Sequence, residues 1–175
     1  EDPTDELQQF QEAADRAYEP CREHFARQAE LRKENQERRE ALIERLTTFA
    51  AEQAGEHPNW RAINQAIVES RREWRHYAPV DQAIVKPLQA RFHALVDELQ
   101  ARLVAEYARN VQTRRDLIAS AAELLNLEDT RKAIDETRNL QRTWKSVGIV
   151  PRNLDNALWD EFRQQCDAVF QRSSQ

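Results

Sequence analysis

The sequence has little of what a large enzyme core or a membrane protein needs. It contains two glycines, two cysteines and no methionine, and only 7% of its 175 residues are aromatic. Two isolated glycines cannot build a phosphate-binding loop, and no apolar run approaches the roughly 18 residues of a membrane span. With so few aromatic residues, narrow seams between helices are favoured over one large globular core.

The missing methionine and the opening Glu-Asp-Pro-Thr lead us to expect a piece of a longer protein. No signal peptide is recognisable. Two cysteines without a partner suit a reducing compartment, so we expect a cytoplasmic protein in which Cys21 and Cys166 are both core thiols. A disulfide between them is the less favoured alternative, because it requires Cα atoms within about 7 Å of each other.

Helix-forming residues are what the sequence has in excess. Ala, Glu, Gln, Arg and Leu dominate, and 33% of the residues are charged. This profile predicts an all-α protein built from long helices. The net charge of −5 argues against a protein that coats nucleic acid along its whole surface.

A tight helical corner is predicted near the C-terminus, in the stretch TWKSVGIVPRNLDNALWDEFRQQCDAVF (143–170). The helix that carries Trp144 should stop at Gly148, and the chain should turn at Pro151. A second helix should start near Asn153. That helix presents three apolar residues toward the corner, namely Leu158, Trp159 and Phe162.

An ungapped copy of this stretch lies earlier in the sequence, which makes the chain a tandem repeat. Trp74 aligns with Trp144, Leu88 with Leu158 and Phe92 with Phe162. Two polar segments also match, at a slightly larger offset. There Asn35 aligns with Asn110 and Arg39 with Arg114.

The corner also carries a family resemblance. Residues 144–152, Trp-Lys-Ser-Val-Gly-Ile-Val-Pro-Arg, followed by Leu-Trp-Asp-Glu-Phe-Arg, resemble the domain-of-unknown-function 349 family of bacterial repeat proteins. The resemblance covers residues 126–175 and is thinner over 56–105, where Ala78, Asp81 and Gln89 stand in place of Gly148, Pro151 and Trp159. It implies a bacterial, cytoplasmic helical repeat protein, and it supplies no activity or functional residue.

The first helix is predicted to begin at Thr4 as N-cap, with Asp5 and Glu6 in its first turn. Pro20 should kink or break it. The polar stretch 30–40 should form a solvated helical bridge, because it is rich in helix formers but nearly free of apolar residues. Gly55 should end the helix.

A heptad seam follows, in which apolar and small residues are spaced by three and four over residues 60–77. A long helix is predicted over 82–125, unbroken through the polar residues 108–116. Asn126 should then cap the helix that carries Trp144 into the C-terminal corner.

We expect these helices to form tandem three-helix bundles that share their long helices, in an elongated rod resembling spectrin. Residues 1–30 would be the closing helix of a truncated preceding repeat. Residues 31–105 would form one bundle, and residues 106–175 a second bundle with the better family match. Neither half of a seam can bury itself alone, which is why neighbouring helices are grouped in this way.

No residue pattern indicates catalysis or a bound metal, cofactor or small-molecule substrate. His93 and Asp97 have a metal-ligand spacing, but the second copy has Arg163 in place of His93. Cys21 and His24 are better explained as a core thiol beside a flanking histidine. The acidic pairs Glu128–Asp129 and Asp160–Glu161 consist of adjacent residues, which point in different directions on a helix and therefore do not favour general acid–base catalysis. We therefore expect no enzyme.

Basic residues recur beside both tryptophans and permit two interpretations. The residues are Arg71, Arg72, Arg75 and His76 near Trp74, and Arg142, Lys145 and Arg152 near Trp144. They either offset helix dipoles or bind phosphate groups, with the tryptophans as seam anchors or as stacking platforms. The dipole and anchor interpretations are favoured.

Two classes of function follow from these observations. The favoured one is a non-catalytic helical scaffold that binds an unidentified protein partner. The alternative is an RNA or nucleic-acid-associated module that uses the basic corners, and the acidic net charge counts against it. No membrane partner is expected.

Overall fold

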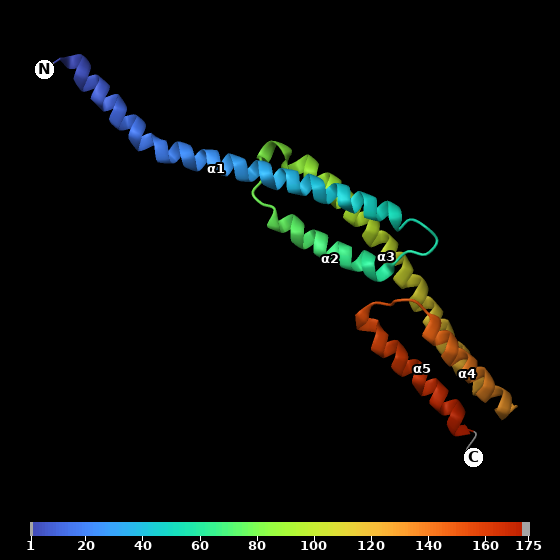
Figure 1. Cartoon of the computed structure of the whole chain (residues 1–175). Coiled ribbons are helices and arrows are strands. Elements are labelled where there is room, and N and C mark those ends of the chain that lie inside the picture. Colours follow the sequence, from blue (N-terminus) through green and yellow to red (C-terminus); the bar gives the residue numbers. More distant parts are fainter. Residues whose placement is uncertain (1, 173–175) are drawn as a thin grey trace. The chain divides into compact units, whose positions relative to one another are not determined.

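The computed structural model describes residues 2–172, and over that range it contains α-helices and no strands (Figure 1). The helices are α1 (Pro3–Glu52), α2 (Trp60–His76), α3 (Gln82–Leu124), α4 (Thr130–Ser146) and α5 (Arg152–Arg172). The prediction of an all-α protein is confirmed. The chain divides into two compact units, unit 1 up to Leu99 and unit 2 from Gln100.

No helix within residues 2–172 combines the length and apolarity that a membrane crossing requires.

Helix α1 begins slightly earlier than predicted. Its N-cap is Asp2, which has an extended backbone and whose side chain accepts a hydrogen bond from the Thr4 amide at 3.1 Å. The assignment of Thr4 as N-cap is therefore wrong. Pro3 fits the first helical position because the amide hydrogen that proline lacks has no helical partner there.

Pro20 does not break α1, which remains one helix as far as Glu52. Figure 1 shows the blue N-terminal part of α1 running in a different direction from the remainder. A bend without a break is the usual response of a long helix to an internal proline. The alternative of a local break near residues 16–20 is therefore wrong.

The α1–α2 loop is capped by residues other than Gly55. Helix α1 ends at Glu52 with Gln53 as C-cap, and Asn59 caps α2 by accepting from the Ala62 amide at 3.0 Å. Gly55 has no positive φ and no neighbour within 4 Å of where a Cβ atom would lie. It is a loop residue, and the prediction that it ends the helix is wrong.

The core of unit 1 draws on α1, α2 and the first half of α3. Its buried residues include Leu42, Ile43, Leu46 and Ala50 of α1, Ile63, Ile67, Ser70 and Trp74 of α2, and Leu88, Phe92, Val96 and Leu99 of α3. The predicted seam of α2 is therefore present. By contrast, every residue from Asp2 to Arg27 is exposed.

The core of unit 2 joins α3, α4 and α5. Its buried residues include Leu117, Ala121, Trp144, Leu158, Phe162 and Cys166. Helix α3 continues through the polar residues 108–116 to Leu124, as predicted from their helix propensity.

Helix α4 begins later than predicted, because Asp129 rather than Asn126 is its N-cap. The Asp129 side chain accepts from the Lys132 amide at 3.1 Å. The Asn126 amide instead donates to the Glu123 carbonyl at 3.0 Å, in the turn that ends α3. Asn126 and Asp129 are both suitable residue types for an N-cap, and the path of the turn after α3 decides that Asp129 takes this role.

Candidate functional site

Both units contain the same three-layer arrangement, which we call the Arg-Trp-Phe stack. In unit 1 the rings of Trp74 and Phe92 are parallel within 3°, with centroids 4.2 Å apart. The guanidinium carbon of Arg39 lies 4.4 Å from the Trp74 centroid. One ring face cannot hold both neighbours, so the indole lies between a cation and a benzene ring.

Unit 2 repeats this geometry with Arg114, Trp144 and Phe162. The aromatic centroids are 4.3 Å apart at an angle of 6°, and the Arg114 guanidinium carbon lies 4.9 Å from the Trp144 ring. Stacked aromatic pairs contribute about 0.5–1.5 kcal/mol beyond their buried area, and a desolvated cation on an indole contributes about 2 kcal/mol. These contacts fix each tryptophan as a core anchor.

An asparagine ties each corner to its long helix. The Asn35 Nδ2 atom donates to the Pro79 carbonyl at 2.8 Å, and the Asn110 Nδ2 atom donates to the Ile149 carbonyl at 2.7 Å. Each hydrogen bond satisfies a carbonyl that the corner removes from helical pairing. The asparagines and arginines therefore locate the corner relative to the long helix.

These residues were missed by the sequence-based interpretation, which placed residues 30–40 on a solvated bridge. That prediction is wrong for Asn35 and Arg39, which are only 5% and 6% exposed. Their recurrence with the same spacing in both copies was the signal that marked them. The polarity of Asn35 and Arg39 favours exposure to solvent. It does not show that the carbonyl groups of Pro79 and Trp74, which are distant in the sequence, accept hydrogen bonds from these side chains.

Arg114 has a carboxylate partner, whereas Arg39 is hydrogen-bonded to a backbone carbonyl. The Arg114 Nη1 atom forms an ion pair with Asp155 at 2.6 Å, whereas the Arg39 Nη2 atom donates to the Trp74 carbonyl at 3.1 Å. Within residues 2–172 Arg39 has no carboxylate partner, and its Nε atom, like that of Arg114, is buried without an acceptor. Burial lowers the pKa of Arg39 from its ordinary value.

The basic residues predicted as an anion site lie on the surface, away from the stacked faces of the tryptophans. They are Arg71, Arg72, Arg75, Arg142, Lys145 and Arg152, and all six are exposed. Arg75 and Lys145 stand in the last turns of α2 and α4. Arg72 and Arg75 line a surface hollow of about 530 Å³ together with Glu73 and His76. The structure thus places Arg39 and Arg114, and none of these six, over the tryptophan rings.

The remaining predicted corner residues have different environments. Leu158 is buried, whereas Trp159 is 41% exposed and its ring is tilted by 53° to that of Trp144, with centroids 6.0 Å apart. Pro151 is half-buried and precedes α5. Gly148 lies against Asn110.

The two thiols are not equivalent. Cys166 is 1% exposed, and burial, followed by the charge of Asp167, raises its pKa to about 11. Cys21 is exposed, so its prediction as a core thiol is wrong. Its helical face has no packing partner within the described residues. Both cysteines are free, and residues 2–172 contain no cluster of three or more potential metal-ligating side chains.

A groove runs between the long helix and the tryptophan-bearing helix of each unit. In unit 1, the Arg45 side chain donates to Glu73 at 2.9 Å across a groove of about 150 Å³. The equivalent groove of unit 2 has a volume of about 480 Å³. Ser120 and Thr143 stand at the positions of Arg45 and Glu73, so the ion pair cannot form there. Leu124, Leu127 and Leu140 give this larger groove an apolar lining.

One protein-family model matches both repeats of the chain. The model described as Domain of Unknown Function (DUF349) matches residues 7–83 and 85–153. The chain belongs to the DUF349 family. Searches of curated proteins and of solved structures give no match.

The two DUF349 matches have the same structural content. Each contains a long helix, the following tryptophan-bearing helix and the corner after it. Trp74 belongs to the first match, but the Phe92 ring that stacks on it belongs to the second. Phe162, which stacks on Trp144, lies beyond residue 153. The phenylalanine that covers each DUF349 tryptophan is therefore supplied by the helix after the match.

Proposed function

We propose that this DUF349 protein is a non-catalytic helical repeat scaffold that binds protein partners in the cytoplasm. The observation that carries the proposal is a bare apolar surface at the start of α1, which we call the α1 face. It consists of Leu7, Phe10, Ala14, Ala17, Tyr18, Cys21 and Phe25. Its four largest side chains are exposed by 59% at Leu7, 72% at Phe10, 52% at Tyr18 and 63% at Phe25. Contiguous apolar surface of this kind is typical of protein contacts.

The buried ionisable groups support a scaffold role over a catalytic one. Arg39 and Arg114 pack on tryptophan rings, and Cys166 is a neutral thiol inside the α3–α4–α5 core. A catalytic group is normally aimed at a cleft where a substrate atom can reach it. These three groups are directed into packing instead, and we propose that the protein works without a cofactor or small-molecule substrate.

We also propose that the repeats form tandem three-helix bundles that share their long helices, in a rod resembling spectrin. The continuity of α3 from Gln82 to Leu124 supports this proposal. Small-angle scattering tests it, because a compact domain of this length has a radius of gyration of about 16 Å. We expect a larger value, and a measured radius close to that of a compact domain would contradict the rod.

Site-specific photo-crosslinking tests the scaffold role. A photoreactive side chain at residue 10 probes the α1 face, and the same group at Val68, which is 50% exposed on α2, is the matched control. We expect protein adducts from residue 10 in excess of those from residue 68, unchanged by nuclease. Equal labelling from both positions, or adducts that nuclease removes, would contradict the proposal.

A further inference from the structure

One short pattern occurs three times in the chain. A phenylalanine is followed at the fourth position by a small or branched apolar residue and at the seventh by another. The three occurrences are Phe10-Ala14-Ala17, Phe92-Val96-Leu99 and Phe162-Cys166-Val169. Because residues with this spacing share one side of a helix, each occurrence defines an apolar face.

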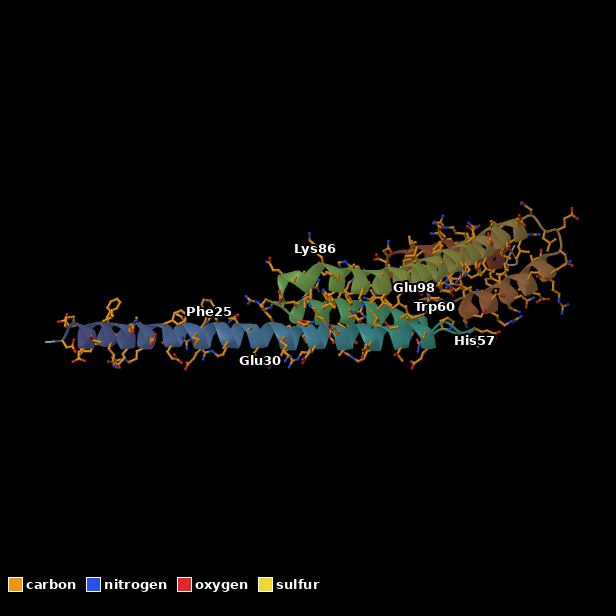
Figure 2. All side chains as sticks on the ribbon, turned by 90° about the horizontal axis from the view of Figure 1, so that it is seen from above. Phe25, Glu30, His57, Trp60, Lys86 and Glu98 are labelled. Atoms are coloured by element: carbon orange, nitrogen blue, oxygen red, sulfur yellow. The ribbon has the colours of Figure 1, made fainter. Side chains whose placement is uncertain are left out.

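Two of these faces are covered and one is bare. Phe92 and Phe162 are 2% and 0% exposed, and the residues that follow them in the pattern are buried as well. Phe10 is 72% exposed. Figure 2 shows Phe25, one of the α1 face residues, on a part of α1 that extends beyond α2 and the start of α3. The same pattern therefore lies in two different environments.

The covering group is the same in both buried cases. It consists of the second half of a long helix and the antiparallel helix after it, which presents a tryptophan to the phenylalanine at 4.2 or 4.3 Å. An arginine lies on the other face of that tryptophan. Both helices of the pair belong to the DUF349 match that precedes the phenylalanine.

We propose that the α1 face docks onto a tryptophan-bearing antiparallel helix pair of another DUF349 unit, with Phe10 stacked on that tryptophan. This inference rests on the proposed scaffold function and names the partner for it. Phe10 would occupy the position that Phe92 holds against Trp74. The docked α1 would then be shifted by one heptad relative to the alignment of Asn35 with Asn110, which places Ala17 level with Phe92. The partner would also bury Cys21, which follows Phe10, Ala14 and Ala17 on the same side of α1.

Charge supports this partner. Residues 3–28 carry six acidic and three basic side chains, whereas α4 carries five basic and two acidic ones, and α2 carries four Arg and two Glu. A closing helix that is negative on balance thus meets a tryptophan-bearing helix that is positive on balance. Complementary charge of this kind favours correct docking.

A second intact copy of the chain does not offer such a surface. Its Trp74 and Trp144 are already stacked on Phe92 and Phe162. Either tryptophan face could therefore accept Phe10 only if the core around it opened. A membrane surface also fits poorly, because anionic headgroups repel the excess of acidic residues around the α1 face.

The test supplies a tryptophan-bearing helix pair by fusion. Residues 104–153 are repeated ahead of Asp2 of the full chain, so that Phe10 follows the added corner at the same interval as Phe162 follows its own corner. The reporter is Cys21, because the added segment contains no cysteine and Cys166 is buried in both proteins. We expect the reaction of Cys21 with a thiol reagent to slow by at least about tenfold, since a buried thiol reacts only when its surroundings open.

The matched control is the same fusion with Phe10→Asp, which should return Cys21 to the rate of the unextended chain. Amide hydrogen exchange over residues 7–25 provides a second measurement, and exchange in α4 and α5 shows whether unit 2 remains folded. A fusion that is folded but leaves Cys21 and these amides as reactive as in the unextended chain would overturn the inference.

Other occupants give different results in the unextended chain. Protection of Cys21 that grows with protein concentration would show that a second copy of the chain, and not a helix pair of another unit, covers the α1 face. Protection of Cys21 by vesicles of phosphatidylcholine and phosphatidylserine would show that a lipid surface covers the α1 face. Either result would overturn the inference. Crosslinking from residue 10 to a protein, combined with an unprotected fusion, would retain the scaffold function while rejecting this partner.

Discussion

Gly148 lies against the Asn110 side chain so closely that a Cβ atom at residue 148 would be 2.8 Å from the Asn110 Nδ2 atom. That nitrogen also donates to the Ile149 carbonyl at 2.7 Å. Glycine at residue 148 is therefore favoured by this close approach and not by its backbone angles, since neither Gly148 nor Gly55 has a positive φ.

Gly148→Ala should destabilise unit 2 by about 1 kcal/mol, the net value of a typical hydrogen bond, because Asn110 must move away from the Ile149 carbonyl. Gly55→Ala is the matched control. Its added Cβ meets nothing within 4 Å, so we expect no loss of stability. Denaturant unfolding of both variants measures the difference. Equal effects would show that the Asn110 contact does not require glycine.

Trp144→Ala should cost about 3–5 kcal/mol, because it removes a buried side chain that contacts Arg114 and Phe162. Trp159→Ala, at the 41% exposed neighbour, should cost much less. Thermal unfolding followed by circular dichroism measures both. An unchanged midpoint for Trp144→Ala would contradict its role as a core anchor and would favour a stacking platform.

Stability should fall as pH rises through the alkaline range because of Cys166. Its folded-state pKa is raised to about 11 from an ordinary 9.0, so the folded protein holds a proton that the unfolded chain releases. The resulting stabilisation is complete below the unfolded pKa and is lost as pH rises from about 9 toward 11. Cys166→Ala should show a shallower decline over this window in denaturant unfolding. Parallel pH profiles for the two proteins would contradict this assignment.

The exposed basic residues should not confer nucleic-acid binding. We expect no association with single-stranded RNA even at low salt, measured by fluorescence anisotropy. Reversing Arg72, Arg75, Arg142 and Lys145 to Glu should lower stability only modestly, chiefly through the last-turn residues Arg75 and Lys145. Salt-sensitive binding that the reversed variant loses would support the nucleic-acid alternative instead.

The sequence by itself determined the helices and the seams on which they pack. The three-and-four spacing around Trp74 and Trp144 set which sides of α2 and α4 are buried, and the recurring motif revealed the repeat. These features are local, because periodicity and helix propensity act within a few turns. Cap positions were less certain, since Asp2 and Thr4, or Asn126 and Asp129, are chemically similar candidates.

The tertiary structure decided which side chains of similar chemistry are buried. Asn35 and Arg39 look like solvated residues in the sequence, but a corner and a tryptophan far from them along the chain cover them. The pattern at Phe10 matches those at Phe92 and Phe162, yet only the latter two meet a tryptophan. Burial depends on what approaches a face from elsewhere in the chain or from a partner, and periodicity within one helix does not contain that information.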